Sequence, residues 1–238
     1  SNPPPLRITH YALRIDPMHL PLQNLHKWDV SPEEAVAIQL SLAGKVSLTS
    51  DLGDVKLIAG VDMSAKDVAR AAVVILSYPD LEVLEVARAE KPLSFPYVPG
   101  LLSFREGPAI LAAFEKLTRW PDLVFFDGQG IAHPRKIGIA SHIGVLIDLP
   151  TIGVGKSPLA VHGPEPGPEP GSWTEWTNRK GEVLAAALRT KARSNPLYIS
   201  PGNKMDLPTA VQYVQATTRG YRLPEPTRQA HNAAAQPV

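Results

Sequence analysis

Short apolar runs and helical patterns alternate along the chain, in an order that predicts one mixed β-sheet. A helix is predicted at 31–46, where Ser-Pro-Glu-Glu supplies a cap and an acidic first turn. Three strand-like runs follow at 55–62, 71–79 and 82–90, and the Tyr-Pro-Asp-Leu turn at 78–81 links the last two. Strands joined by links this short pair antiparallel, so the three runs should form a meander.

The pattern changes after residue 100, where helices and strands begin to alternate. Helical patterns and strand-like runs follow one another at 107–120 (helix), 122–127 (strand), 137–149 (helix), 151–157 (strand), 182–190 (strand), 196–200 (strand) and 206–218 (helix). Alternation of this kind indicates parallel pairing with helices on the sheet faces. We therefore predict an α/β fold with a mixed central β-sheet, an antiparallel meander followed by parallel strands, flanked by helices.

Proline marks the segments that fall outside this pattern. There are 25 prolines in 238 residues, roughly twice the average usage of about 5 %. Residues 1–24 form a proline-rich, irregular N-terminal extension. The sequence GPEPGPEPG at 163–171 cannot bury apolar surface and should be an exposed insert. A single domain is predicted over 25–231, followed by a flexible tail at 232–238.

Composition excludes several classes of protein. Hydrophobic residues make up 44 % of the chain, but no apolar run approaches the roughly 20 residues of a membrane helix. The first residues lack the pattern of a secretory signal. The absence of cysteine excludes disulfides, thiolate metal sites and a cysteine nucleophile, and fits a reducing compartment. We expect a cytoplasmic monomer with no membrane partner.

The overall charge does not by itself indicate a nucleic-acid partner. The net charge is only +1, from 24 basic and 23 acidic residues, so a basic binding surface would have to be local. Lysine and arginine cluster at 133–136, 156, 179–180, 191–193 and 219–228. These clusters could together build a positive face around an acidic site.

Two aspartates occur where predicted buried strands emerge from the core. Asp62 ends the run LIAGVD and Asp127 ends LVFFD. Because ionised carboxylates avoid burial unless they are paired or bind a metal, neighbouring strands would bring these groups together around a divalent cation such as Mg²⁺. Glu106, at the start of the helix before the Asp127 strand, could add a third carboxylate or hold a metal-bound water. Taken singly, each aspartate could instead be a turn or cap residue, and Glu106 could complement a helix dipole.

Two rival functions follow from the same residues. A hydrolase could be built from Ser141 and a histidine, but the chain has no G-x-S-x-G nucleophile elbow. The chain could also be a non-catalytic nucleic-acid-binding module. The joint presence of Asp62, Glu106 and Asp127 favours an enzyme over that second alternative.

Several long motifs, in order, resemble the endonuclease V family. They are LHKWDVSPEEA, GVD, FPYVPGLLSFREGP, FFDGQGIAHPRKIGIASHIG, PTIGVGKS, SPGNKMDLPTA and RLPEPTRQAH. The resemblance covers residues 25–231 and excludes the N-terminal extension and the 163–171 insert. It implies a ribonuclease H-like fold and a Mg²⁺-dependent endonuclease of DNA repair, with Mn²⁺ as an alternative ion. Such enzymes recognise deoxyinosine and cut the second phosphodiester bond on its 3′ side, leaving 3′-hydroxyl and 5′-phosphate ends.

The resemblance also implies a role for each residue of a catalytic site. Asp62 and Asp127 match the metal-binding aspartates, and Glu106 matches the acidic residue of the same site. Lys156 matches a lysine near the scissile phosphate, and His231 matches a histidine near the active site in some members. Without the resemblance, Lys156 would be read as a solvated loop lysine and His231 as a surface histidine.

A second group of matches concerns recognition of the damaged base. Tyr97, in the stiff segment PYVP, matches the residue of the family that acts as a wedge between the two DNA strands. A buried core tyrosine is the alternative. Leu102, Gly128 and His133 match the pocket for the rotated base, where glycine permits close backbone approach. His133 could instead be a structural histidine.

Some questions stay open at the level of the sequence. Some family members act on inosine in RNA, so an inosine-specific endoribonuclease is an alternative, and the number of metals is open. Asn203 stands where some members carry histidine, with no role assigned. Asp206 is more simply a helix cap than a ligand.

Overall fold

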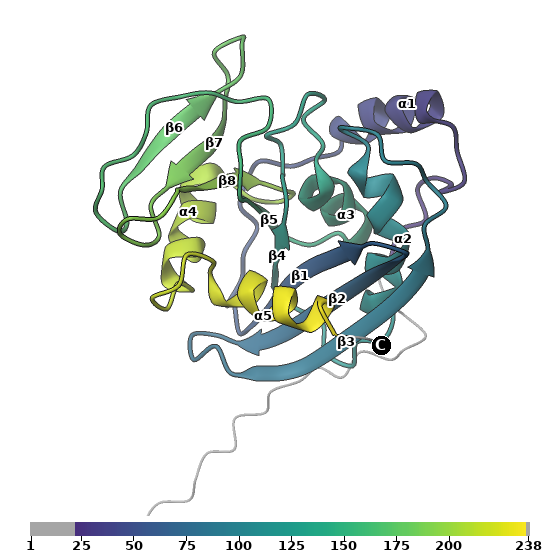
Figure 1. Cartoon of the computed structure of the whole chain (residues 1–238), viewed down its shortest axis with the longest axis horizontal. Coiled ribbons are helices and arrows are strands. Elements are labelled where there is room, and N and C mark those ends of the chain that lie inside the picture. The colour runs from purple at the N-terminus through teal and green to yellow at the C-terminus, as the bar shows by residue number, and fades with distance from the viewer. Residues whose placement is uncertain (1–21, 237–238) are drawn as a thin grey trace, which may run out of the picture.

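Eight strands form one mixed sheet at the centre of the computed structural model, which describes residues 22–236 (Figure 1). The strands are β1 Leu57–Ala65, β2 Val68–Ser77, β3 Val83–Pro92, β4 Leu123–Asp127, β5 Thr151–Gly155, β6 Trp173–Thr177, β7 Val183–Leu188 and β8 Leu197–Pro201. Their order across the sheet is β3-β2-β1-β4-β5-β8-β7-β6.

The pairing confirms the predicted fold class. Strands β1, β2 and β3 form the antiparallel meander, and β1 then pairs parallel with β4, as β4 does with β5. Strands β8, β7 and β6 extend the far edge with antiparallel pairs. Strand β6, whose sequence is WTEWT, was not predicted. Its two tryptophans are three positions apart, so the five residues show no two-residue period, and they come just after the proline-rich insert.

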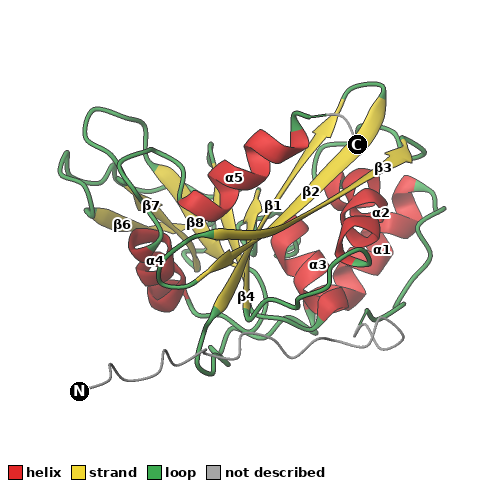
Figure 2. Cartoon of the chain, turned by 90° about the horizontal axis from the view of Figure 1, so that it is seen from below, coloured by secondary structure: helices red, strands yellow, loops and turns green. Residues whose placement is uncertain are grey.

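There are five helices in the described residues, α1 Pro32–Ala43, α2 Leu102–Phe114, α3 Ile139–Ile147, α4 Leu207–Ala216 and α5 Glu225–Ala234. Four of them cover the two faces of the sheet, and α1 packs against α3 (Figure 2). Because side chains alternate along a strand, Val124 and Phe126 of β4 pack toward α2 and α3, while Leu123 and Phe125 pack toward α4. Helix α5 covers β1 and β2 on the same face as α4. No described helix is both long and apolar enough to cross a membrane.

Two helices depart from the predicted boundaries. Helix α2 begins at Leu102 and ends at Phe114, so Pro108 lies inside it rather than at its start. Helix α5 was not predicted, because its sequence EPTRQAHNAA offers only alanines as an apolar stripe. It ends at Ala234, and Ala233 and Ala234 are buried. The predicted flexible tail from residue 232 therefore starts inside an ordered helix.

The segments predicted to be irregular are only partly described. The proline-rich extension at 1–24 lies outside the described residues except for its last three positions. The 163–171 insert runs along the surface with only Pro166 buried. Arg189 of the loop after β7 donates hydrogen bonds to the carbonyls of Pro166 and Gly167.

A chain of neutral histidines ties the segment before α1 to α2 and α3. The carbonyl of Lys27 accepts from His26 Nδ1, so His26 Nε2 accepts from His142 Nε2 at 2.7 Å, and Ser103 donates to His142 Nδ1. Burial lowers the pKa of His142 to about 3 and that of His26 below its ordinary value of 6.5. The contact between the two Nε2 atoms needs one of them to accept, so it cannot hold once both rings are protonated.

Stability should therefore fall in mild acid. The unfolded chain takes up protons near pH 6.5, whereas the folded histidines resist protonation, so their contribution to the free energy of unfolding declines as the pH is lowered below about 6.5. Each such histidine contributes a slope of up to about 1.4 kcal/mol per pH unit. Urea unfolding at pH 7.5 and pH 5 measures this, and His142→Gln should flatten the decline. Because Glu106, whose pKa is raised to about 8, acts in the opposite sense in both proteins, the two are compared with each other: an equal decline in His142→Gln and the unmodified protein would contradict the buried neutral pair.

Candidate metal centre and nucleic-acid site

Two neighbouring parallel strands place the two aspartates side by side. In the β1–β4 ladder Val61 lies opposite Phe126, so the next residues, Asp62 and Asp127, emerge at the same end of the sheet. Asp127 is the last residue of β4, as predicted. Asp62 is not the last residue of β1, which continues to Ala65 beside β2. It does mark the point where β1 changes from buried to partly exposed.

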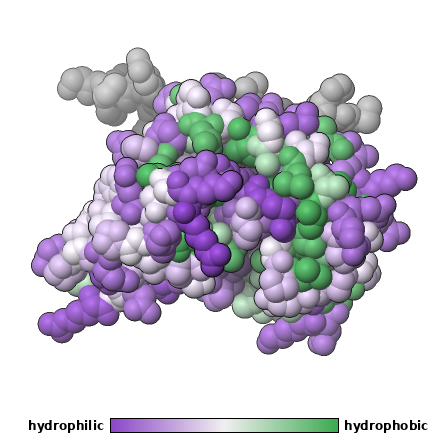
Figure 3. Space-filling view, turned by 90° about the horizontal axis from the view of Figure 1, so that it is seen from above, coloured by the Kyte–Doolittle hydropathy of each residue, from purple (hydrophilic) through white to green (hydrophobic). Residues whose placement is uncertain are grey.

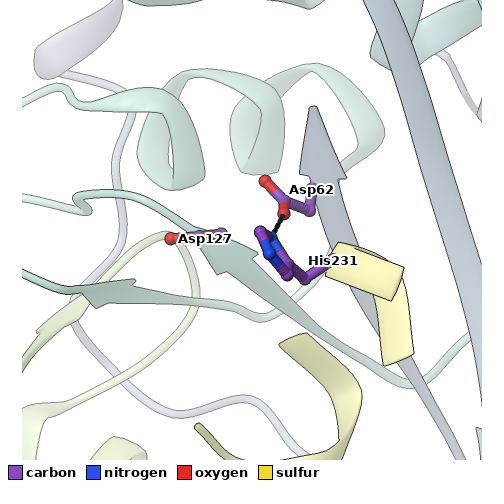
Figure 4. Close-up of side chains that lie close together, drawn as sticks. All are labelled: Asp62, Asp127 and His231. Atoms are coloured by element: carbon purple, nitrogen blue, oxygen red, sulfur yellow. Dashed lines mark hydrogen bonds and ion pairs between the residues drawn. The ribbon is translucent and has the colours of Figure 1, made fainter. Parts of the chain in front are cut away.

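Helix α5 adds an imidazole nitrogen from a distant part of the sequence. His231 Nδ1 lies 2.7 Å from Asp62 Oδ2, and both side chains point to the space beside Asp127 (Figure 4). One ligand atom from each of the three residues lies within 4.8 Å of the others.

A glycine in β1 allows α5 to come this close. A Cβ built on Gly60 would lie 1.8 Å from the Pro226 carbonyl oxygen, at the start of α5. The backbones of strand and helix therefore touch where any larger side chain would hold them apart. Residue 60 is two positions before Asp62, so the contact sets the height of α5 over the acidic group.

Lys156 and Glu106 line a cavity of about 320 Å³ together with Asp62, Asp127 and His231 and with Met63, Ser64, Leu102, Ala234 and Ala235. Lys156, directly after β5, forms an ion pair with Asp127 Oδ2. Glu106 is the fifth residue of α2, beyond the first turn, which removes the helix-dipole explanation. The predicted catalytic residues are thus brought together from five separate elements or their ends.

The electrostatics of this cavity favour a bound cation. Burial raises the pKa of Glu106 to about 8, with further contributions from the charges of Asp62 and Asp127. The pKa of Asp62 is also raised, by burial and by the nearby Asp127. Carboxylates that repel one another in a partly dry site are stabilised when a divalent cation shares their charge. Two carboxylates with an imidazole nitrogen are a donor set that fits such an ion.

The predicted wedge residue stands clear of the protein surface. Tyr97 is 72 % exposed, which excludes the buried-core alternative for this side chain. It lies in the loop before α2, where Phe95 is buried on one side and Leu101 on the other. The tyrosine ring is therefore presented to solvent by a loop that is anchored at both ends.

Three donors hold the carbonyl of Gly100 just after this segment. Gln39 Nε2, His133 Nε2 and Arg135 Nη2 lie 2.9, 2.9 and 2.8 Å from the Gly100 oxygen. Arg135 Nε also donates to Gln39 Oε1 at 2.6 Å, which closes the network. Gly100 has a φ of +80°, a conformation that favours glycine. The network joins α1 and the 133–136 loop to the base of the loop that carries Tyr97.

Removing the amide of Gln39 should loosen that loop. Gln39→Met keeps the volume of the side chain but leaves the Arg135 donor unpaired, so we expect a loss of about 1–3 kcal/mol in the free energy of unfolding. Hydrogen exchange of the amides at 98–102 should accelerate as well. Ser41→Ala, at an exposed position of α1, is the control and should change neither. Unaltered exchange at 98–102 in Gln39→Met would show that the loop does not depend on this contact.

The predicted base-pocket residues occupy different positions relative to the cavity. Leu102 is 38 % exposed and lines the cavity itself. Gly128 has a φ of +151°, and a Cβ there would lie 2.7 Å from Ile139 Cγ2. His133 is buried, burial lowers its pKa to about 4, and its Nδ1 accepts from the Arg135 backbone. Both ring nitrogens of His133 therefore form hydrogen bonds within the protein. This fits the alternative that His133 is a structural histidine.

Other candidates from the sequence have structural roles. Ser141 is fully buried in α3, which removes the alternative of an accessible serine nucleophile. Asp206 caps α4 by accepting from the Thr209 backbone, as predicted. Asn203 is buried and bonds the Ser47 backbone and the carbonyls of Gly144 and Leu149.

Two residues near the cavity were missed because no local pattern marks them. Gln39 reads as an ordinary polar position on α1. Arg222, in the loop before α5, donates to the carbonyl of Lys156 at 3.0 Å and so braces the backbone that carries the lysine.

Comparisons with known proteins find similar chains over most of this sequence. The sequence profile of the endonuclease V family matches residues 40–232. Endonuclease V of Trichormus variabilis is 49 % identical, over 88 % of this chain and 96 % of its own. The crystal structure of endonuclease V from Streptomyces avermitilis superposes with a TM-score of 0.82 at 41 % identity, covering 87 % of this chain and 92 % of that one. Ciona intestinalis endonuclease V, solved with a 24mer DNA containing an inosine, gives 0.75 at 30 % identity, covering 85 % and 95 %.

Proposed function

The chain belongs to the endonuclease V family, and from this premise we propose that it is a Mg²⁺-dependent endonuclease that recognises deoxyinosine in DNA. It hydrolyses the second phosphodiester bond on the 3′ side of the lesion and leaves 3′-hydroxyl and 5′-phosphate ends. The observation that carries the proposal is the meeting of Asp62, Asp127 and His231, whose ligand atoms lie within 4.8 Å of one another.

Hydrolysis of a phosphodiester needs an activated water and neutralisation of the charge that develops on the phosphate. A divalent cation bound by Asp62, Asp127 and His231 would supply Lewis-acid chemistry for both needs. Glu106, with a pKa raised to about 8, can hold or release a proton near neutral pH and is suited to orient the attacking water. The protein's own residues thus fix the position of the scissile phosphate and its nucleophile.

Lys156 provides positive charge on the other side of the cavity. Its ammonium group is ion-paired with Asp127, and it would turn toward a phosphate oxygen once the aspartate charge is shared with a cation. A lysine in this place acts as a point charge for phosphate binding. Its backbone is held by Arg222, which fixes the point from which the lysine side chain extends.

Lesion recognition is proposed for the loop that carries Tyr97. The exposed ring would fill the space left when the damaged base rotates out of the stack. Leu102 and Gly128 would form the sides of the pocket, where backbone groups can read the carbonyl that distinguishes hypoxanthine from adenine. His133 would support this pocket by holding Gly100.

Loss of the wedge should weaken binding of the lesion. Tyr97→Ala removes an exposed ring, so the fold is unaffected, and we expect affinity for an inosine-containing duplex to fall about tenfold, given the ~1–3 kcal/mol of one base–aromatic stack. Metal binding should be unchanged. Tyr221→Ala, another exposed tyrosine, is the comparison variant. Equal losses of affinity for inosine-containing and normal duplexes would count against a wedge.

Side-by-side cleavage of matched oligonucleotides tests the function as a whole. Inosine-bearing DNA, the same sequence with adenine, and inosine-bearing RNA are incubated with the protein in Mg²⁺ and in EDTA. The proposal expects a nick two bonds 3′ to inosine in DNA, with no reaction in EDTA. Preferential cutting of the RNA would identify an endoribonuclease instead, and cutting of the adenine strand at the same rate would exclude lesion recognition.

A further inference from the structure

A second, larger cavity lies beyond His133, outside the catalytic cavity. Its volume is about 740 Å³, and its lining comes from the 133–136 loop, the segment after Lys156 and the turn between β6 and β7. The residues are His133, Pro134, Lys136, Ala160, Val161, His162, Asn178, Arg179, Lys180 and Glu182. We call this space the basic pocket. The turn that forms its outer wall is the tip at the top of Figure 1, on the face shown in Figure 3.

Positive charge is in excess in the basic pocket. Lys136 forms an ion pair with Glu182 at 2.7 Å, which neutralises the carboxylate among the lining residues. Arg179 and Lys180 are exposed, and neither has a salt-bridge partner within residues 22–236. Two uncompensated charges in one cavity stand out in a chain whose total net charge is +1. A cavity of this kind fits an anionic ligand.

The wall that carries these charges is held in a defined shape. Asn178 Oδ1 accepts from the backbone of Lys180 and Glu182, at 2.9 and 3.0 Å, and Asn178 Nδ2 donates to Glu182. Gly181 takes a φ of +77°, which completes the turn. The turn therefore presents its cations from a preformed loop, which reduces the entropic cost of binding.

Two short stretches of chain lead from the catalytic cavity to the basic pocket. Lys156 lines the first and Ala160 the second, and four residues span at most roughly 14 Å. The other stretch runs from Asp127 to His133, which touches Gly100 at the base of the Tyr97 loop. The proposed base pocket therefore lies between the catalytic carboxylates and the basic pocket, within the reach of a few nucleotides.

We infer that the basic pocket binds the phosphodiester backbone of the substrate strand on the 5′ side of the lesion. The inference rests on the proposed function, which puts the scissile bond on the 3′ side of the rotated base. A strand that passes from the carboxylates over Leu102 toward His133 continues into the basic pocket. Arg179 and Lys180 contact its phosphates there and carry no sequence preference.

The test combines a change in the protein with a change in the substrate. Arg179→Ser with Lys180→Ser removes both charges, and this pair is called the pocket variant. The control variant, Lys56→Ser with Lys116→Ser, also removes two exposed charges. Lys56 precedes the start of β1 and Lys116 follows the end of α2, whereas Asp62 and Glu106 lie toward the other ends of these elements. Single-turnover cleavage in Mg²⁺ is measured on two inosine-bearing single strands. One extends on both sides of the lesion, and the other begins at the inosine and extends only 3′.

On the longer strand the pocket variant should need about tenfold more protein for half-saturation, with an unchanged maximal rate. The slope of log affinity against log salt should shrink by roughly 1.4, about 0.7 for each phosphate that is no longer neutralised. On the shortened strand the pocket variant should have the same affinity as the unmodified protein. The control variant should have the affinity of the unmodified protein on both strands. Arg179→Lys with Lys180→Arg should restore binding, since charge rather than shape is used.

Equal losses of affinity on the two strands, or no loss on the longer one, would overturn the inference. Failure of the proposed function would be visible separately, since the unmodified protein would then cut adenine-containing strands as fast as inosine-containing ones. Melting temperatures of all variants should agree, because each substituted side chain is exposed.

Discussion

Asp127→Asn should lower the rate of cleavage of an inosine-containing strand by about a thousandfold or more. Asparagine has the same shape but no charge, so it leaves the strand end intact while removing a cation ligand beside Asp62. Cleavage under single-turnover conditions measures the rate, and calorimetric titration with Mg²⁺ measures binding of the ion. Cleavage and Mg²⁺ binding should disappear together.

The same substitution should leave the fold nearly unaltered. It removes the repulsion that helps raise the pKa of Asp62 and sacrifices one partly exposed ion pair with Lys156, worth about 1 kcal/mol or less. Urea unfolding should therefore change little. Asp80→Asn, in the exposed turn after β2, serves as the control and should keep full activity. Unreduced cleavage by Asp127→Asn would remove this carboxylate from the mechanism.

Gly60→Ala should damage both stability and activity, although residue 60 touches no substrate. The new methyl group would lie 1.8 Å from the Pro226 carbonyl oxygen, so α5 must move away from β1. Overpacking of this kind costs about 1–3 kcal/mol. The shift also withdraws His231 from Asp62, and activity should fall toward that of His231→Ala.

Gly53→Ala provides the matched comparison. A Cβ at Gly53 meets no atom within 4 Å, so this variant should unfold at the same urea concentration as the unmodified protein, or slightly above it. Hydrogen exchange at 225–234 should increase in Gly60→Ala alone. If both glycine variants behaved alike, the tight contact of α5 with β1 would not be what positions the histidine.

The sequence was informative where short-range patterns decide the structure. The meander follows from alternating apolar runs with short links, and the placing of Asp62 and Asp127 follows from two runs that end in a carboxylate. Parallel pairing of β1 and β4 then brings these residues together with no further information. Local periodicity is sufficient here because the apolar residues of each strand show which of its positions are buried.

The remainder depends on contacts that no local pattern encodes. Helix α5 has few large apolar residues and is held by alanines against β1 and β2, so its position is a property of the sheet rather than of its own sequence. Gln39 is polar on a helix that reads as a surface element, yet it is 1 % exposed because it bonds Gly100 and Arg135. Hydrogen-bond partners 61 and 96 residues away cannot be read from a window of neighbours.

The docking of α5 on β1 has a consequence for the protein while it is being made. Asp62 and its partner His231 are 169 positions apart, so at about 5–20 residues per second the ribosome needs roughly 8–34 s between them. Until α5 has left the exit tunnel and packed, the imidazole of His231 is absent from the acidic group. The candidate metal centre is thereby assembled only after α5 has packed on β1.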